Sequence, residues 1–344
     1  MIIDVLKKAQ QGQHLSADET YGAFREIMGG EVENPVIIAA LLTAMQMNVP
    51  TIEEVTGAAR AMRGAGVKLK APADAVDIVG TGGDGFGTFN VSTTAALIAA
   101  GAGVTIAKHG NRASTSKSGS ADCLAALGYD LNKSVGEVEQ SIAEHGIGFC
   151  FANSCHPAMR FASPVRRALP YRTIFNLLGP LTNPAGVTRH ALGVYALDVI
   201  PLYIGALKAL GTKRALVFCG PDGLDELGLA GVSHVAELNV DGSVREYDFD
   251  PKKVFGEYFP ITAIAGGTPE VNAALTLSVL KGVENGAYRL AAELNAAAAI
   301  VAAGLADSLE AGVPLAAESI DSGKALAKLE TLVGAPVTVL LKGR

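Results

Sequence analysis

Apolar side chains recur every three or four positions through the first part of the chain, and glycine or proline interrupts the pattern between runs. Residues at this spacing share one face of an α-helix, so the pattern predicts short amphipathic helices. A residue type that caps helix N-termini stands before three of these runs: Ser16, Asn34 and Thr51. We therefore predict a small all-helical domain over residues 1–70.

From residue 75 onward the pattern changes to short, β-rich apolar runs separated by helical segments. The expected strands are residues 76–79, 104–107, 148–151, 190–194, 214–218 and 235–239. Strands that alternate with helices favour a mostly parallel central sheet flanked by helices, so the predicted fold class is α/β. Residues 94–100 are expected to be helical, and so is the tail from 272 to 332.

The length of 344 residues exceeds the usual size of a single hydrophobic core, which favours two domains. We expect the larger α/β domain to take residues 71–155 and 186–344. Between its two parts lies an arginine-rich helical insertion at about residues 156–185. We expect this insertion to pack on the amino-terminal helices.

Charge and hydropathy narrow the possible partners. The net charge of −6 argues against nucleic acid as the main partner. The apolar stretch 294–306 is shorter than the ~18 residues that a membrane span needs. No basic and then apolar leader comes before the first helix, so we expect a cytoplasmic protein with no membrane partner.

The cysteines show no Cys-x-x-Cys spacing and lie in apolar surroundings. They are Cys123, Cys150, Cys155 and Cys219. We expect reduced thiols in the core, with a zinc site or a disulfide as the less favoured alternatives.

The most informative segment is glycine-rich, at residues 80–87, between the first expected strand and a hydroxyl-rich helix start. Glycine lets the backbone adopt positive φ and approach a bulky anion, and a helix start directs N–H groups toward it. Polar side chains surround this glycine loop: Asp84, Thr88, Asn90, Ser92 and Thr93. The segment therefore predicts a phosphate site.

Other interpretations of the glycine loop are weaker. No Gly-Lys-Ser/Thr follows, which excludes a Walker loop, and the spacing after Gly80 and Gly82 does not match the dinucleotide fingerprint. A flexible turn remains an alternative. Ser92 and Thr93 could serve as plain helix caps, a role compatible with anion binding.

Residues 108–120 follow a second expected strand and hold three cations and five hydroxyl groups. Ligands of open α/β sheets bind at the carboxyl ends of strands, so this segment suits a second anion or the far end of a doubly phosphorylated one. A solvated basic loop is the alternative. The sequence alone does not make His109 a general base.

Two further segments complete the candidate chemistry. Asp225 and Glu226 follow an apolar strand, and in a loop both carboxylates can face one Mg²⁺ site, although an ordinary polar loop is the alternative. Arg166 and Arg167, near aromatic and proline residues, suit a planar carboxylate, because guanidinium binds it with two parallel hydrogen bonds. Surface cations on a helix are the alternative there, and the sequence does not say which arginine faces inward.

Taken in order, these segments resemble the anthranilate phosphoribosyltransferases, which belong with the nucleoside-phosphorylase-like transferases. The motifs that carry the resemblance are residues 80–84, 90–93, 108–112, 116–122, 156–159, 172–184 and 222–226. They extend over most of the chain in the order of the family, and their combination is specific. The resemblance implies transfer of a phosphoribosyl group from phosphoribosyl pyrophosphate to anthranilate in tryptophan biosynthesis. It also implies two Mg²⁺ ions per subunit and a homodimer joined through the helical domain.

The resemblance also implies site residues, none of them a general acid or base. The implied donor-binding residues are Gly80, Gly83, Asp84, Thr88, Asn90, Val91, Ser92, Thr93, Lys108, His109, Gly110, Asn111, Arg112, Ala113, Ser114, Thr115, Ser116 and Ser120. Those implied for anthranilate are Gly80, Asn111, Arg166 and His156. Those implied for the metal are Ser92, Asp225 and Glu226.

Two positions depart from the family pattern, and two other functions stay open. Cys155 stands before the His-Pro-Ala motif, and Leu169-Pro170-Tyr171 replaces a leucine–glycine turn. We therefore expect the local shape of the anthranilate channel to differ from the family pattern. A pyrimidine-nucleoside phosphorylase is one alternative, but residues 172–184 and the acidic pair argue against it. A non-catalytic, nucleic-acid-binding relative is the other, and the acidic net charge argues against it.

Overall fold

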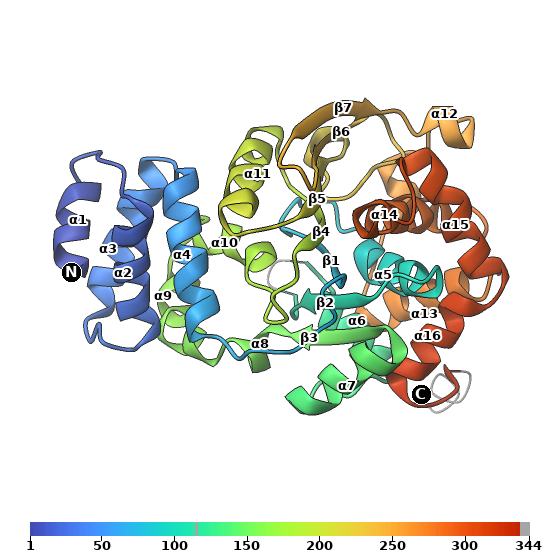
Figure 1. Ribbon diagram of the computed structural model, residues 1–344, viewed down its shortest axis with the longest axis horizontal. Coiled ribbons are helices and arrows are strands. Elements are labelled where there is room, and N and C mark those ends of the chain that lie inside the picture. The colour runs from blue at the N-terminus through green and yellow to red at the C-terminus, as the bar shows by residue number, and fades with distance from the viewer. Residues whose placement is uncertain (114–115, 338–344) are drawn as a thin grey trace.

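The computed structural model describes residues 1–113 and 116–337. A bundle of helices lies at one end of the molecule, and an α/β unit forms the rest (Figure 1). Ser114 and Thr115, both expected in the donor site, lie outside the described residues. Among the described residues, no helix has the length and apolar character to cross a membrane.

Four helices form the amino-terminal bundle: α1 (Ile2–Ala9), α2 (Ala17–Met28), α3 (Pro35–Met47) and α4 (Ile52–Ala65). The expected caps are confirmed. Ser16 and Thr51 each accept a hydrogen bond from the backbone N–H three residues later, and Asn34 accepts one from Val36. These caps satisfy N–H groups that have no partner within the helix, which is why the helices begin at these residues.

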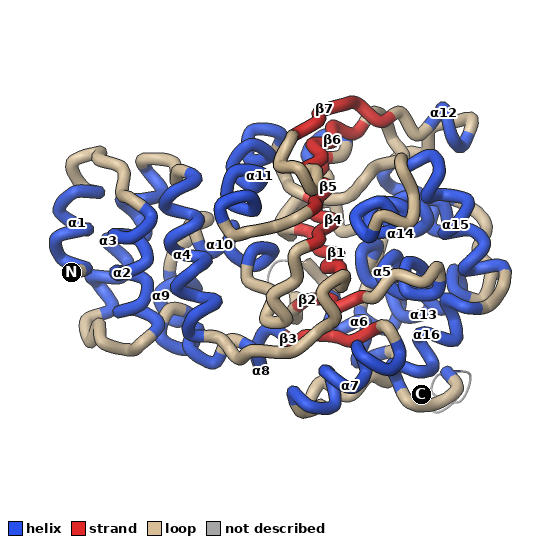
Figure 2. The backbone as a smooth tube through the Cα atoms, viewed as in Figure 1, coloured by secondary structure: helices blue, strands red, loops and turns tan. Residues whose placement is uncertain are grey.

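A seven-stranded sheet crosses the middle of the molecule, in the order β3-β2-β1-β4-β5-β6-β7 (Figure 2). Its strands are β1 (Val76–Gly80), β2 (Ile106–Gly110), β3 (Ile147–Phe151), β4 (Arg189–Gly193), β5 (Arg214–Cys219), β6 (Ser233–Leu238) and β7 (Val244–Phe249). The first five in chain order pair in parallel, and β6 and β7 pair antiparallel at one edge. The predicted α/β class with a mostly parallel sheet is confirmed.

Three sequence predictions about this sheet and its helices need correction. β2 begins at Ile106, not at residue 104, and continues to the glycine that ends it. β7 was not expected, because an exposed edge strand rich in charged residues lacks the apolar run used as the signal. The helix α5 (Val91–Gly101) begins before residue 94. Its N-cap residue is Asn90, so Ser92 and Thr93 lie inside its first turn and are not its caps.

Helices cover both faces of the sheet (Figure 1). The longer carboxyl-terminal helices lie with α5 on one face, and α11 lies on the other with the bundle. The remaining helices of the α/β unit are α6 (Ser120–Ala126), α7 (Val135–His145), α11 (Ile200–Ala209), α12 (Lys252–Phe255), α13 (Pro269–Leu280), α14 (Ala287–Ala303), α15 (Leu309–Asp321) and α16 (Lys324–Val333). Three short 3₁₀ turns connect elements of this unit: η3 (Leu197–Val199), η4 (Pro221–Gly223) and η5 (Ile261–Ile264).

The arginine-rich insertion consists of short helices and 3₁₀ turns. They are η1 (Pro157–Phe161), α9 (Ser163–Ala168), α10 (Phe175–Leu178) and η2 (Gly179–Leu181), and the short helix α8 (Ala152–Cys155) comes directly before them. α9 contacts α3, and α10 contacts α4. Phe24 of the bundle, Phe175 of the insertion and Val217 of β5 belong to one apolar core, so burial joins the bundle to one face of the sheet.

The four cysteines are free thiols buried in the core, as expected. Burial disfavours the thiolate and raises the pKa of Cys155 and of Cys219 to about 11. They are therefore inert, apolar parts of the packing at neutral pH.

Candidate active site

The predicted site segments meet at the carboxyl ends of β1, β2 and β5. β1 ends at Gly80 and continues into the glycine loop, β2 ends at Gly110, and the segment after β5 carries the acidic pair. Parallel strands direct their carboxyl ends to one edge of a sheet, so segments far apart in sequence become neighbours there. The fold thus brings together the three groups of residues that were expected to bind one ligand.

The glycine loop is built for close contact with the acidic pair. The backbone N–H of Gly82 donates a hydrogen bond to Asp225 Oδ2 at 2.5 Å. A Cβ atom on Gly80 would lie 2.4 Å from the same oxygen, so this position requires glycine for space. Gly83 has φ +75°, which requires glycine for conformation. The two glycines of this loop that were named for the donor therefore have a structural reason at the atomic level.

Asp225 and Glu226 are both turned into the protein. Glu226 Oε1 accepts a hydrogen bond from the backbone N–H of Ser92, at 3.2 Å, in the first turn of α5. Burial and the nearby Asp84 raise the pKa of Asp225 to about 7. Burial and Asp225 raise the pKa of Glu226 well above its ordinary value. The site therefore concentrates carboxyl groups that resist ionisation on their own, and a bound cation would stabilise their ionised form.

The side chains at this site fit a hard divalent ion such as Mg²⁺ only if a bound substrate supplies further oxygen ligands. Among the described residues, no three His, Cys, Asp or Glu side chains converge as a complete metal site. The acidic pair offers oxygen ligands, and so does Ser92, whose backbone N–H contacts Glu226. Mg²⁺ commonly takes one or two carboxylates and completes its shell with water and substrate phosphates.

Lys108 is buried under this cluster. Its ammonium donates to the carbonyl of Ile78 at 2.6 Å and to Ser92 Oγ at 3.3 Å. Burial lowers the pKa of Lys108, and the carboxylates of Asp77 and Glu226 oppose that effect. The alternative of a solvated basic loop is wrong for this residue.

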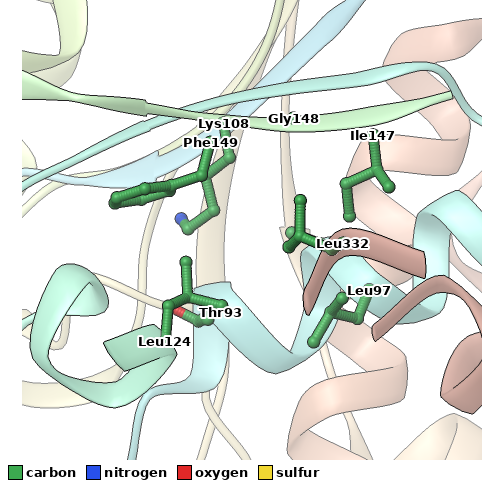
Figure 3. A pocket seen from close by; sticks show the side chains of 9 residues that line it. Thr93, Leu97, Lys108, Leu124, Ile147, Gly148, Phe149 and Leu332 are labelled. Atoms are coloured by element: carbon green, nitrogen blue, oxygen red, sulfur yellow. The ribbon is translucent and has the colours of Figure 1, made fainter. Parts of the chain in front are cut away.

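Figure 3 shows the Lys108 side chain beside Phe149, directed toward Thr93 across a small cavity. The cavity measures about 10 Å³, room for one water molecule at most, so it is not a substrate pocket. Val91 and Thr93 are buried as well. These two residues and Lys108 thus form part of the buried layer on which the glycine loop and the loop after β2 rest.

The rest of the loop after β2 is held by its own polar groups. Arg112 pairs with Asp122 at 2.8 Å, and Asp122 also accepts the N–H of Ala113. Asn111 Oδ1 accepts the Arg112 N–H, and the Asn111 carbonyl accepts a hydrogen bond from Ser120 Oγ. The charge of Arg112 is therefore partly used inside the loop.

Three more residues that were expected in the donor site have defined contacts within the protein. The Ser116 hydroxyl donates to the carbonyl of Ser118 at 3.4 Å. A Cβ on Gly110 would lie 2.1 Å from Ser120 Oγ, so the strand end needs glycine. Thr88 forms an isolated bridge with Ala265. Asn90 takes part in a network described below.

Two histidines lie next to each other at the rim of the insertion. The rings of His109 and His156 meet edge to face, with centroids 5.2 Å apart. Burial lowers the pKa of His109 to about 3 and that of His156 to about 4. Both imidazoles are therefore neutral at pH 7, which suits lining a channel more than carrying charge.

The structure decides between the two adjacent arginines. Arg166 is half-buried, with its guanidinium 5.3 Å from the ring centre of Phe175, whereas Arg167 is exposed. No carboxylate pairs with Arg166 in the described part of the chain. Its charge is therefore free to bind an anionic group.

The comparisons with known proteins agree with this geometry. The model of the glycosyl transferase family helical bundle domain matches residues 3–66, and that of the a/b domain matches residues 72–326. An anthranilate phosphoribosyltransferase of Rubrobacter xylanophilus is 48% identical over 97% of both chains. The chain belongs to the anthranilate phosphoribosyltransferases. The resemblance on which the sequence-based expectations rested is confirmed.

Solved structures of the family have the same fold. The enzyme of Thermus thermophilus matches with a TM-score of 0.91 at 46% identity, covering 96% of this chain and 98% of that one. Anthranilate phosphoribosyltransferase from Saccharomyces cerevisiae in complex with PRPP and Mg matches at 0.88 with 29% identity, covering 98% of both chains. A complex of the yeast enzyme with 4-fluoroanthranilate matches at 0.87 with 27% identity, again covering 98% of both.

Two residues of the site were missed by the sequence-based assignment. Arg172, within a family motif, donates to the carbonyl of Gly83 and lies 3.7 Å from the ring centre of Tyr195. Asp77, in β1, is fully buried and accepts the backbone N–H of His109 at 3.0 Å. An aspartate inside an apolar strand was the available signal for the second, since a buried carboxylate needs a specific partner.

Proposed function

We propose that this chain transfers the 5-phosphoribosyl group of phosphoribosyl pyrophosphate to the amine of anthranilate. The products would be N-(5-phosphoribosyl)anthranilate and pyrophosphate, in tryptophan biosynthesis. The observation that carries the proposal is the contact of the acidic pair with both the glycine loop and the helix that follows it. Asp225 accepts from Gly82 in the loop, and Glu226 accepts from Ser92 in the first turn of α5. An anion cradle in contact with two carboxylates needs a cation between them and the phosphates.

Ser92, Asp225 and Glu226 would hold Mg²⁺, with two ions per subunit. When bound, the metal stabilises negative charge on the departing pyrophosphate. The ammonium of Lys108 contacts Ser92 Oγ, so its positive charge would also stabilise the negative charge of the departing pyrophosphate. The N–H groups of Gly82 and Phe86 are bonded to Asp225 and Asp84, so the conformation of the glycine loop is set before the substrate arrives and need not reorganise during the reaction.

The reaction forms a bond between the anthranilate nitrogen and the anomeric carbon and breaks the bond from that carbon to pyrophosphate. An aromatic amine is neutral at pH 7, so its lone pair is available without a strong base. The lowered pKa values of His109 and His156 keep both rings neutral and agree with a path that assigns neither residue as a base. Holding the two substrates in line supplies much of the acceleration.

Anthranilate would bind through Arg166, with Gly80, Asn111 and His156 lining its path. The free, half-buried guanidinium of Arg166 suits the carboxylate of the acceptor. Burial lowers the pKa of Arg166 from a very high ordinary value, so the group stays charged.

We also propose the domain limits and assembly expected from the sequence. Residues 1–70 with 156–185 would move as one unit against residues 71–155 and 186–344, which agrees with the contact of α9 with α3. A homodimer through the helical domain agrees with apolar side chains exposed on the bundle, among them Val36 and Met47. We propose a cytoplasmic location for the same protein.

The test is the loss of anthranilate fluorescence on mixing with phosphoribosyl pyrophosphate and Mg²⁺. We expect a loss that needs both additions and that a chelator abolishes, with one pyrophosphate released per anthranilate consumed. Fluorescence that stays constant, together with phosphorolysis of thymidine in the same preparation, would establish the pyrimidine-nucleoside phosphorylase instead.

A further inference from the structure

Asn272, in the first turn of α13, is buried and has a side-chain amide of defined orientation. Its Oδ1 accepts a hydrogen bond from the backbone N–H of Gly267 at 2.7 Å, and its Nδ2 donates to Asn90 Oδ1 at 2.8 Å. A backbone N–H can only donate, so Gly267 determines which side of the Asn272 amide is the oxygen. The side that faces Asn90 must therefore be the donor.

This contact determines the orientation of the Asn90 amide in turn. Asn90 Oδ1 also accepts the hydroxyl of Ser118 at 2.9 Å, and its Nδ2 donates to the Ser118 carbonyl at 3.3 Å. Asn90 is the N-cap residue of α5, yet its side chain makes no capping hydrogen bond. Both lone-pair directions of its oxygen are occupied, and its second N–H has no protein acceptor among the described residues.

We propose that Asn272 is a positioning residue for the sugar-phosphate donor. It holds Asn90 so that an amide N–H, and not the carbonyl oxygen, faces the anionic ligand at the start of α5. The proposal rests on the proposed function, because it takes Asn90 as part of the donor site. The opposite amide orientation would present a carbonyl oxygen to a phosphate or hydroxyl oxygen and weaken binding by repulsion.

The segment before α13 strengthens the same assignment. The N–H of Gly266 donates to the Gly87 carbonyl at 2.8 Å, and the Phe89 N–H donates to the Ile264 carbonyl at 3.0 Å. These bonds fix the second half of the glycine loop to the segment that carries Asn272. Asn272 thus connects the glycine loop, through Asn90 and Ser118, to the loop after β2.

The decisive variant is Asn272→Asp, which keeps the size of the side chain. An ionised carboxylate still accepts from Gly267 but cannot donate to Asn90. The Asn90 oxygen then faces either this carboxylate or, if the amide turns over, the Ser118 carbonyl, so the native orientation loses its support in both cases. At pH 8.5 we expect the Kd of phosphoribosyl pyrophosphate with Mg²⁺, measured by calorimetry, to rise at least about tenfold. The KM for anthranilate should stay within about twofold of the native value.

Thr276→Val is the matched control. Thr276 is a buried polar residue one turn further along α13, and its hydroxyl contacts the Thr94 hydroxyl at 2.9 Å. Thr94 in turn donates to the backbone carbonyl of Asn90 and does not contact its side-chain amide. We expect this variant to bind the donor as the native protein does. Asn272→Ala, which removes the donor without adding charge, should weaken donor binding in the same direction and serves if the aspartate variant does not fold.

Three outcomes overturn the inference. The first is native donor affinity of Asn272→Asp at pH 8.5. The second is an equal loss of affinity for donor and anthranilate, which would indicate general damage. The third is failure of both Asn272 variants to fold, which would assign the residue to stability. Failure of the proposed function would look different, since the native protein itself would then neither bind the donor nor consume anthranilate.

Discussion

Asp225 and Gly82 are 143 positions apart in the chain and are joined by a hydrogen bond of 2.5 Å. The bond runs from the glycine-loop N–H to a carboxylate that lies after β5. It explains why Gly80 carries no side chain, because a Cβ there would collide with the same carboxylate. The glycine loop and the acidic pair are therefore one structural unit. The predictions that follow test what this unit and its surroundings do.

Removing the negative charges of the acidic pair should abolish metal-dependent turnover. We expect Asp225→Asn with Glu226→Gln to lower kcat by about 100-fold or more at saturating Mg²⁺, since metal stabilisation of a leaving group contributes several kcal/mol. The amides keep the shape of the buried side chains, so the melting temperature should not fall. Steady-state rates across a Mg²⁺ titration measure this, and native activity of the double variant would show that the acidic pair holds no essential metal.

A methyl group on Gly80 should act through Asp225. The Cβ of Gly80→Ala would lie 2.4 Å from Asp225 Oδ2, so the carboxylate must move. We expect the Mg²⁺ concentration for half-maximal activity to rise about tenfold, in line with an overpacking cost of about 1–3 kcal/mol.

Gly64→Ala is the control for that variant. Nothing lies within 4 Å of a Cβ at Gly64, near the end of α4, so activity should be unchanged. Stability should rise by about 0.5–1 kcal/mol, because alanine favours helix over glycine. Equal Mg²⁺ dependence of the two alanine variants would contradict the steric argument.

Arg166 should determine the affinity for the acceptor. We expect Arg166→Ala to raise the KM for anthranilate by about 10- to 100-fold, the loss of a charged hydrogen-bonded contact of about 1.5–3 kcal/mol. The KM for phosphoribosyl pyrophosphate should change little. Arg167→Ala, one position along and exposed, should leave both values near native. A similar rise in both arginine variants would indicate a general electrostatic effect on anthranilate binding.

His190 should make the protein sensitive to acid. Burial lowers its pKa to about 3, so between the ordinary value near 6.5 and pH 3 the unfolded chain binds a proton that the folded chain does not. This contribution to stability is complete above pH 6.5 and decreases as the pH falls, by at most about 1.4 kcal/mol per pH unit. Burial raises the pKa of Asp77 to about 6, which acts in the opposite direction, so the difference between two proteins is the useful quantity.

The comparison protein for this prediction is His190→Gln, which has no titrating ring. Subtracting its unfolding free energy, measured in urea from pH 7 to pH 4, from that of the native protein isolates the histidine. We expect the difference to move against the native protein as the pH falls. A difference that does not vary with pH would mean that the buried ring titrates normally.

Exposed apolar residues on the bundle should hold the proposed homodimer together. Val36 is 68% exposed and Met47 is 80% exposed, at the two ends of α3. We expect Val36→Glu with Met47→Glu to give a monomer by light scattering, because two buried charges would face each other across a symmetric interface. Val283, which is 72% exposed, lies on the α/β unit. The control variant Val283→Glu should therefore remain a dimer. A dimer in both cases would place the interface elsewhere.

Much of the fold was predictable because its signals are local. The caps at Ser16 and Thr51 and the apolar period of the bundle depend on residues within a turn or two of each other, and each was confirmed. β7 was missed because its own residues carry no apolar run. They form a strand through their pairing with β6, and the apolar pattern does not record that pairing.

The candidate site was predictable in composition and not in geometry. The glycine loop and the acidic pair stood out as residue types suited to phosphate and Mg²⁺. Their mutual contact was not deducible, since it depends on β1 and β5 lying in one sheet. Asn272 gave no signal at all, because a single asparagine at a helix start looks like any other polar residue until its partners are known.

The sequence by itself determined the helical character of the first 70 residues, the alternation of strands and helices that follows, which residue types could bind an anion or a metal, and which family the chain resembles. Only the tertiary structure decided which of two adjacent arginines is half-buried, that the Lys108 ammonium contacts Ser92 Oγ, and that the Asn90 oxygen accepts a hydrogen bond from Asn272. The physical reason is that chemical type and local conformation are properties of short segments. Burial and hydrogen-bond partners come from segments that the sheet brings together from distant parts of the chain.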